Sequence, residues 1–172
     1  KIFNKIYLKF LDVKKKEKND SFVDAIFPFI GKESYFKLFG SKGFIESQLL
    51  VPNNIVESFL EEVKNLCKIY EPLITLFSLK KLSGEQKLLR FEGNGICVTF
   101  DFVNNKKNHL FLVKIDELCV KYNVLPSIIK DSRLSQSVFE KCYSEVEIFR
   151  KKLISFDKKR IYQSELSKRL KI

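Results

Sequence analysis

The sequence is poor in glycine and histidine and has no long hydrophobic run. Its 172 residues contain six glycines and a single histidine, His109. A phosphate-binding loop needs closely spaced glycines, and a catalytic triad or a zinc site needs histidine near suitable partners. None of these spacings is present in the sequence, and no stretch approaches the roughly 20 apolar residues of a membrane-spanning helix. On its own, therefore, the chain presents no complete active site of a familiar type.

Methionine is also absent, and the four cysteines are far apart. The first residue is Lys1, so we expect the chain to be cut from a longer protein, with any targeting signal outside it. The cysteines include no Cys-x-x-Cys pair, which argues against a structural metal site. Most of them lie in apolar patterns typical of buried thiols. Free thiols favour a reducing, cytoplasmic location.

The net charge is +11, from 32 basic and 21 acidic residues. Such a charge suits an anionic partner, namely a nucleic acid, an acidic lipid surface or a phosphorylated substrate. It is equally compatible with a lysine-rich composition that has no binding role. Only five of the basic residues are arginines, which does not favour nucleic acid, because base and phosphate readers prefer arginine. Two clusters, residues 14–16 and 158–160, remain candidates for peripheral contact with a membrane surface.

Hydrophobic periodicity predicts the order of the elements. Strands are predicted over residues 44–51, 73–82 and 95–103, with short extended segments at 88–91, 124–125 and 128–129. Helices are predicted over residues 3–10, 34–39, about 55–70, about 108–122, two after Leu134, and 165–170, and a charged linker over 14–20. Asn53 or Asn54 is expected to cap the helix that follows Pro52.

This order predicts an α+β fold, an antiparallel sheet with helices packed on one face, followed by a helical C-terminal tail. A shift in composition near residue 125 divides the chain into a sheet-bearing part, 1–125, and a helical segment, 126–172. In the strand over 95–103, Ile96, Val98 and their alternate neighbours should face one side, and Cys97, Thr99 and Asp101 the other.

Two local patterns suggest a site. Glu46 and Gln48 are two residues apart on one strand, so their side chains share a face. Lys130 follows two β-branched residues and precedes an Asp131-Ser132 pair expected to open a helix, which would point one cationic side chain from a strand end into a pocket. An ordinary polar sheet face and a Lys130–Asp131 ion pair are the alternatives.

An ordered set of motifs resembles the cap and C-terminal part of FAD-linked sugar oxidases. These enzymes belong to the vanillyl-alcohol-oxidase-like superfamily, which includes the decaprenylphosphoryl-ribose oxidase group and the sugar-lactone oxidases. The matching segments are Phe27-Pro28-Phe29, Tyr35, Phe39-Gly40, Gly43 to Pro52, Lys130 to Arg133, and Asp157 to Leu170 with Ser164, Glu165 and Arg169. The chain departs from the family at Phe29-Ile30, where the family has Leu-Asp, and at Ser127, where it has tyrosine.

The resemblance implies an enzyme that oxidises a CH–OH group of a sugar or polyol by hydride transfer to FAD. Segment 1–125 would then be the substrate-binding cap domain, and 126–172 would complete a flavin domain supplied by the missing N-terminal part. Lys130 would be catalytic and, with Arg133, would contact the flavin. The fragment alone is expected to be inactive and free of FAD.

The resemblance also implies a substrate-binding set for a sugar or a sugar-phospholipid. Of the two glutamines that face the substrate in the family, the second is kept as Gln48, and the first position is Glu46. Lys80 or Lys81 matches the pocket lysine of the family. Thr99 falls where mycobacterial members carry a reactive cysteine. The competing hypothesis is a basic α+β module that binds nucleic acid or an anionic membrane.

Overall fold

The computed structural model describes residues 21–23, 34–37 and 39–172. Contacts divide the chain into two units, residues 1–38 and 39–172. In the first unit, α3 (Ser34–Lys37) forms a single helical turn, within the helix predicted over 34–39. The predicted helix over 3–10, the linker over 14–20 and the motif at Phe27-Pro28-Phe29 lie outside the described residues. The elements described below belong to the second unit.

The second unit contains a four-stranded antiparallel sheet. After a short 3-10 turn, η1 (Gly40–Lys42), come β1 (Phe44–Pro52), β2 (Ile74–Leu82), β3 (Gly95–Val103) and β4 (Leu125–Pro126). Their spatial order is β2-β3-β1-β4, so the two long central strands, β1 and β3, pair along their whole length. The three long strands were predicted within about one residue at each end, and the bounds of β3 were predicted as observed.

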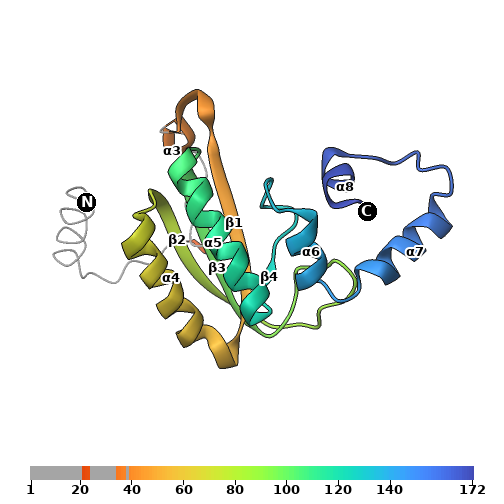
Figure 1. Cartoon of the computed structure of the whole chain (residues 1–172), viewed down its shortest axis with the longest axis horizontal. Helices are drawn as coiled ribbons and strands as arrows, with labels where there is room; N and C mark the ends of the chain where they lie inside the picture. The colour runs from red at the N-terminus through yellow and green to blue at the C-terminus, as the bar shows by residue number, and fades with distance from the viewer. Residues whose placement is uncertain (1–20, 24–33, 38) are drawn as a thin grey trace. The chain divides into compact units, whose positions relative to one another are not determined.

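Two helices connect the strands and cover one face of the sheet (Figure 1). Helix α4 (Val56–Tyr70) joins β1 to β2, and α5 (Lys106–Tyr122) joins β3 to β4. Each helix thus links two strands that flank a third, which gives the β-α-β-β-α-β order of a ferredoxin-like fold. The α+β prediction, with helices on one face of an antiparallel sheet, is confirmed.

Alternating apolar side chains along β1 and β3 explain why this face of the sheet packs against the helices. Ile45 and Leu49 of β1 lie opposite Phe102 and Val98 of β3, and all four side chains are at most 5% exposed. The ring of Phe102 lies 5.7 Å from that of Phe111 on α5. Burying large apolar side chains between sheet and helices supplies most of the free energy of folding.

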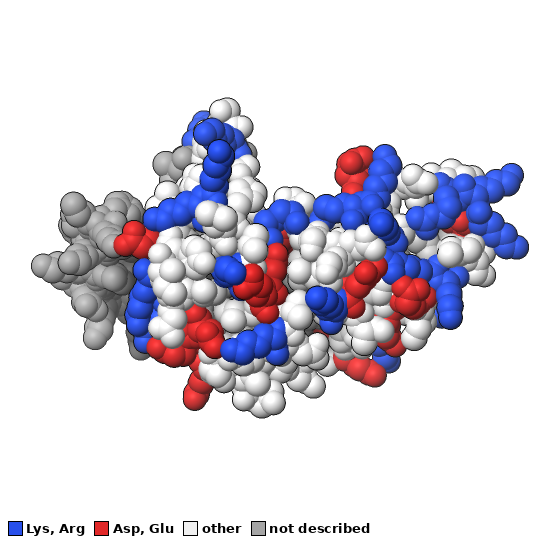
Figure 2. Space-filling model, viewed as in Figure 1, with Lys and Arg blue, Asp and Glu red and all other residues white. Residues whose placement is uncertain are grey.

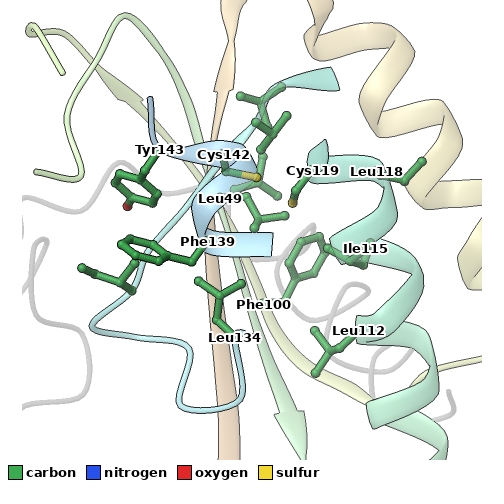
Figure 3. Packing of buried hydrophobic residues seen from close by; sticks show 14 of the residues in the cluster. Leu49, Phe100, Leu112, Ile115, Leu118, Cys119, Leu134, Phe139, Cys142 and Tyr143 are labelled. Carbon is green, nitrogen blue, oxygen red and sulfur yellow. The ribbon is translucent and has the colours of Figure 1, made fainter. Parts of the chain in front are cut away.

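The C-terminal tail packs into the same core. It contains α6 (Gln136–Cys142), α7 (Val146–Phe156) and α8 (Glu165–Leu170). Side chains of α6 and of Tyr143 lie beside Leu49 and α5 (Figure 3), and the Tyr143 hydroxyl donates to the carbonyl oxygen of Pro126 at 2.7 Å. The helical tail is therefore confirmed as an element, whereas the functional division near residue 125 stays a prediction.

Two predictions around the first half of the sheet are wrong. Neither Asn53 nor Asn54 caps a helix, because Asn53–Ile55 forms a 3-10 turn and α4 begins after Ile55 without a side-chain cap. Residues 88–91 form no strand. Leu88 has a positive φ of 53°, and its N–H donates to the Glu145 carboxylate, so the segment turns toward the tail rather than pairing.

Two further corrections concern the segment that carries Lys130. Ile128-Ile129 is not extended but lies in a turn, in which the Asp131 N–H donates to the carbonyl of Ser127 at 3.1 Å. The Asp131-Ser132 pair does not open the next helix. That helix, α6, starts at Gln136, with the Ser135 hydroxyl as its N-cap. As the N-cap, the Ser135 hydroxyl accepts the N–H of Val138 at 3.3 Å, which has no partner within the helix, and serine commonly has this role.

Gly95 cannot carry a side chain in this sheet. A Cβ built there would lie 2.3 Å from the carbonyl oxygen of Val51 on the paired strand, and backbone cannot move aside as a flexible side chain would. We expect Gly95→Ala to lower the free energy of unfolding by about 1–3 kcal/mol, measured by urea denaturation. Gly40→Ala is the control, because Gly40 has a φ of 60° and nothing within 4 Å, so this change should lower the free energy of unfolding by only about 1 kcal/mol through backbone strain. Equal losses would contradict the steric account.

Candidate functional site

Polar side chains gather on the face of the sheet turned away from α4 and α5, where Leu50 and Leu76 also lie. In β1 the alternate residues Glu46 and Gln48 lie on it, and the strand pairing places Asp101 and Thr99 of β3 opposite them. Ser78 of β2 is next to Thr99. We call this surface the polar face, defined by Glu46, Gln48, Ser78, Lys80, Thr99 and Asp101.

Lys130 is brought to the polar face from far along the chain. Its ammonium lies 3.3 Å from Oε2 of Glu46, 84 residues away in sequence, while the amide of Gln48 donates to Oε1 of the same carboxylate at 2.7 Å. The Lys130 side chain is 49% exposed and that of Glu46 19%. Lys130 is therefore half-exposed rather than enclosed in a pocket, and its partner is Glu46, so the alternative of a Lys130–Asp131 ion pair is wrong.

The strand register separates the two adjacent lysines of β2. Lys80 lies opposite Cys97, and Lys81 lies opposite Ile96, so Lys80 belongs to the polar face and Lys81 to the helix-covered face. Both side chains are exposed. Of the two candidates for the pocket lysine, only Lys80 shares a surface with Glu46 and Thr99.

Thr99 and Cys97 form a buried pair on the polar face. Both are 4% exposed, and the Cys97 sulfur lies 3.8 Å from the Thr99 hydroxyl oxygen. Burial raises the pKa of the Cys97 thiol, against smaller lowering effects from Thr99 and the charge of Lys80. A thiol of raised pKa carries little thiolate at neutral pH and is a weak nucleophile.

Thiol labelling should reflect this burial. Under native conditions at neutral pH we expect iodoacetamide to modify the partly exposed Cys67 first and Cys97 at least about tenfold more slowly. Site-resolved mass spectrometry over time measures both rates, and the urea-unfolded chain, in which all four thiols should react alike, is the control. Native labelling of Cys97 as fast as that of Cys67 would contradict its placement.

Arg133 is directed to α5 and not to the polar face. Its two terminal nitrogens donate to the Asp116 carboxylate at 2.6 and 2.8 Å, and one of them also to Asp131 at 2.9 Å. Burial works to lower the pKa of Arg133, but its bonds to Asp116 and the charge of Asp131 raise it above its usual value. Arg133 is thus committed to two carboxylates, and its contact with a flavin stays a prediction.

A cavity of about 240 Å³ lies apart from these residues, beyond the end of β1. Its lining includes Leu50, Glu92, Asn123, Lys141 and Cys142. The volume is below the range of most small-molecule sites, and none of the predicted site residues lines it. The candidate site is therefore the polar face. Among the described residues no group of three or more histidine, cysteine or acidic side chains could hold a metal ion.

Positive charge is dense over the tail and mixed with negative charge over α4 and α5 (Figure 2). Lys158 and Lys159 are exposed, whereas Arg160 donates to the backbone oxygen of Ile172 at 2.6 Å. The other cluster, residues 14–16, lies outside the described residues. No helix in the described ranges combines the length and the apolar character needed to cross a membrane.

The structure adds two residues that the sequence did not single out. Ser78 lies on the polar face beside Thr99, and Asp116 holds Arg133 from another helix. Alternation along β2 signals Ser78 once the pairing is known, but no local pattern connects Asp116 with Arg133.

Comparison with known proteins gives a distant relationship. No protein-family model matches the chain. Over 137 residues, 79% of its length, the chain is 25% identical to the decaprenylphosphoryl-beta-D-ribose oxidase of Mycolicibacterium smegmatis (strain ATCC 700084 / mc(2)155). It spans 30% of that protein's length. The chain is therefore similar, at a distance, to part of an oxidase.

Proposed function

We propose that this chain is the substrate-binding and C-terminal part of an FAD-dependent oxidoreductase that oxidises a CH–OH group of a sugar or polyol. One observation carries the proposal. Lys130, Glu46 and Gln48, which the resemblance assigns to the reacting side of such an enzyme, meet on one face although Lys130 is remote in sequence. The distant similarity to an oxidase supports it.

The donors on the polar face fit one half of the cofactor. The flavin ring carries carbonyl oxygens and ring nitrogens, and it accepts a hydride from carbon when bound. Lys130 and Lys80 offer ammonium groups, and Gln48 an amide, as donors toward such atoms. The sequence has no glycine-rich loop for the pyrophosphate, so the nucleotide half would be held by the remainder of a longer protein.

The polar face also suits a substrate with several hydroxyl groups. The Glu46 carboxylate accepts hydrogen bonds and the Gln48 amide donates and accepts, whereas the Thr99 hydroxyl is buried beside Cys97 and lies beneath this surface. Lys130 has three N–H donors and a half-exposed side chain, so it can donate to a substrate oxygen while remaining near Glu46. A positioned ammonium would stabilise negative charge that develops on that oxygen as its carbon is oxidised.

The tail has the surface expected of a segment that docks against a further domain. Ile154, Phe156, Ile161 and Tyr162 are 57–81% exposed. Large apolar side chains gathered at an exposed surface are typical of interaction sites. In the proposed enzyme this surface would pack on the flavin-binding part.

The alternative, a basic nucleic-acid or membrane module, has less support. All five arginines donate to groups within the chain, in the case of Arg90 to Glu92 and in the case of Arg150 to Glu140. Phosphate readers use arginine as a free, bidentate donor. Exposed lysines such as Lys158 remain available for weaker contacts with an anionic surface.

The experiment is purification of the whole natural protein that contains this chain. We expect it to be yellow and to release stoichiometric FAD on denaturation, measured by absorbance and chromatography. The isolated 172-residue chain is the control and should be folded and colourless. A whole protein that contains no flavin, and is therefore as colourless as the isolated chain, would overturn the proposal.

A further inference from the structure

We propose that Arg169, at the C-terminal end of the chain, is a positioning residue for Lys130. It acts through a cluster of Asp116, Asp131, Arg133 and Arg169, in which Asp131 is buried and the others are partly buried, and which we call the turn lock. The inference rests on the proposed function only for the chemical role of Lys130. The structural link between Arg169 and the turn that carries Lys130 depends only on contacts within this chain.

The turn that carries Lys130 is first tied to the sheet. The N–H of Ser127 donates to the carbonyl oxygen of Gln48 at 2.8 Å, and the N–H of Asp131 donates to that of Ser127 at 3.1 Å. The backbone of Lys130 therefore lies between two fixed points, Ser127 on the strand side and Asp131 on the tail side. Its side chain extends from there to Glu46.

Asp131 fixes the second of these points. One oxygen of its carboxylate accepts the N–H groups of Arg133 and Leu134 at 3.0 and 3.1 Å, and the other accepts a guanidinium nitrogen of Arg133 at 2.9 Å. The side chain is only 2% exposed. Asp116 of α5 holds Arg133 with two further bonds, so the turn is anchored to the helix layer as well.

Arg169 closes the lock from α8. Its guanidinium donates to the carbonyl oxygen of Asp131 at 3.3 Å and to that of Leu134. The two carbonyl groups belong to the first and last residues of segment 131–134, whose turn is stabilised by the Asp131 side chain. Arginine suits this task because its planar fork reaches two acceptors at once, whereas lysine carries a single nitrogen.

Contacts within the C-terminal motif, Asp157 to Leu170, position Arg169. The Asp157 carboxylate accepts the N–H groups of Ile161 and Tyr162, both at 2.9 Å, and shapes the loop before α8. Ser164 and Ser167 form a capping box at the helix start, and Leu170 is fully buried. Together these contacts fix the direction of α8, from which Arg169 donates its two hydrogen bonds to the turn that follows Lys130.

The test measures Lys130 in the 172-residue chain without flavin or substrate. Site-resolved acetylation, followed by mass spectrometry, gives the rate at each lysine. We expect Arg169→Met to raise the Lys130 rate about two- to fivefold, because a turn released from Arg169 exposes the Lys130 side chain more and a surface ion pair contributes up to about 1 kcal/mol. Glu46→Gln, which removes the pair directly, should give the same increase.

The double variant separates positioning from general destabilisation. If Arg169 acts through the Lys130–Glu46 pair, combining Arg169→Met with Glu46→Gln should add nothing further at Lys130. Lys168→Met, on the same helix with an exposed partner in Glu165, should leave the rate unchanged. Arg169→Lys can reach one carbonyl at a time and should give an intermediate rate, and it replaces Arg169→Met if that variant fails to fold.

An unchanged Lys130 rate in a folded Arg169 variant would overturn the inference. Additive increases in the double variant, or a uniform rise at all lysines, would do the same, because either result indicates loosening unrelated to the Glu46 pair. Since no flavin takes part, failure here leaves the proposed oxidase activity to its own test.

Discussion

Replacing Lys130 with methionine should slow flavin reduction by substrate in the whole protein by about 10²–10³-fold, equivalent to roughly 3–4 kcal/mol of lost transition-state stabilisation. The ammonium is the positive charge that the structure brings beside Glu46 and Gln48 on the polar face. Methionine keeps the length of the side chain but cannot donate. Anaerobic stopped-flow absorbance of the flavin measures the rate.

Two variants make this result specific. Lys130→Arg should restore only part of the rate, because the larger guanidinium spreads its charge. Lys81→Met should leave it unchanged, since Lys81 is exposed but lies on the opposite side of β2 from Lys80. If Lys130 served only as a surface partner of Glu46, its loss would cost under about 1 kcal/mol of stability and would not affect reduction.

Arg133→Met should lower the free energy of unfolding by about 3–5 kcal/mol, the usual cost of removing one partner from a buried ion pair. Two carboxylates, Asp116 and Asp131, would lose their cation, and the Asp131 side chain is 2% exposed. Urea denaturation measures the loss. Arg90→Met is the matched control, because its pair with Glu92 is exposed on both sides and should cost under about 1 kcal/mol.

The stability deficit of Arg133→Met should also depend on pH. Burial already raises the pKa of Asp131 in the folded chain, and the charge of Arg133 opposes that rise. Without Arg133 the folded pKa rises further above the unfolded value, so the folded state favours the protonated acid. The protonated acid therefore contributes to the stability of the folded variant at low pH, and this contribution is lost as the pH rises through the raised folded pKa. Urea denaturation between about pH 4 and pH 7 should show that the loss of stability caused by Arg133→Met grows with pH. A loss that does not change with pH would contradict this account.

Sequence reasoning succeeded where the signal was local and repeated. Alternation from Gly95 to Val103 predicted both the strand and its two faces, because successive side chains of a strand point to opposite sides. The helix predicted over 165–170 is observed with those bounds, and the Ser164 side chain caps it. The shared face of Glu46 and Gln48 followed from the same period of two.

Other features depended on contacts that no local pattern records. Asn53 has good capping chemistry, but the chain forms a 3-10 turn there and α4 starts later. Residues 88–91 are apolar enough for a strand, yet Leu88 is held by Glu145, 57 residues away. The sequence left a Lys130–Asp131 ion pair open as an alternative, but Arg133 satisfies that carboxylate and Lys130 reaches Glu46, which no local pattern indicates.

The central claim is that the polar face, including Lys130, meets the flavin and substrate. Lysine acetylation of the whole protein, compared between its FAD-bound and FAD-free forms, tests it directly. Bound cofactor should protect Lys130 and Lys80 while Lys81, the exposed neighbour on the other side of β2, and Lys64 on α4 keep their rates. Equal rates at Lys130 and Lys80 in the two forms, or protection shared by Lys81, would contradict the account.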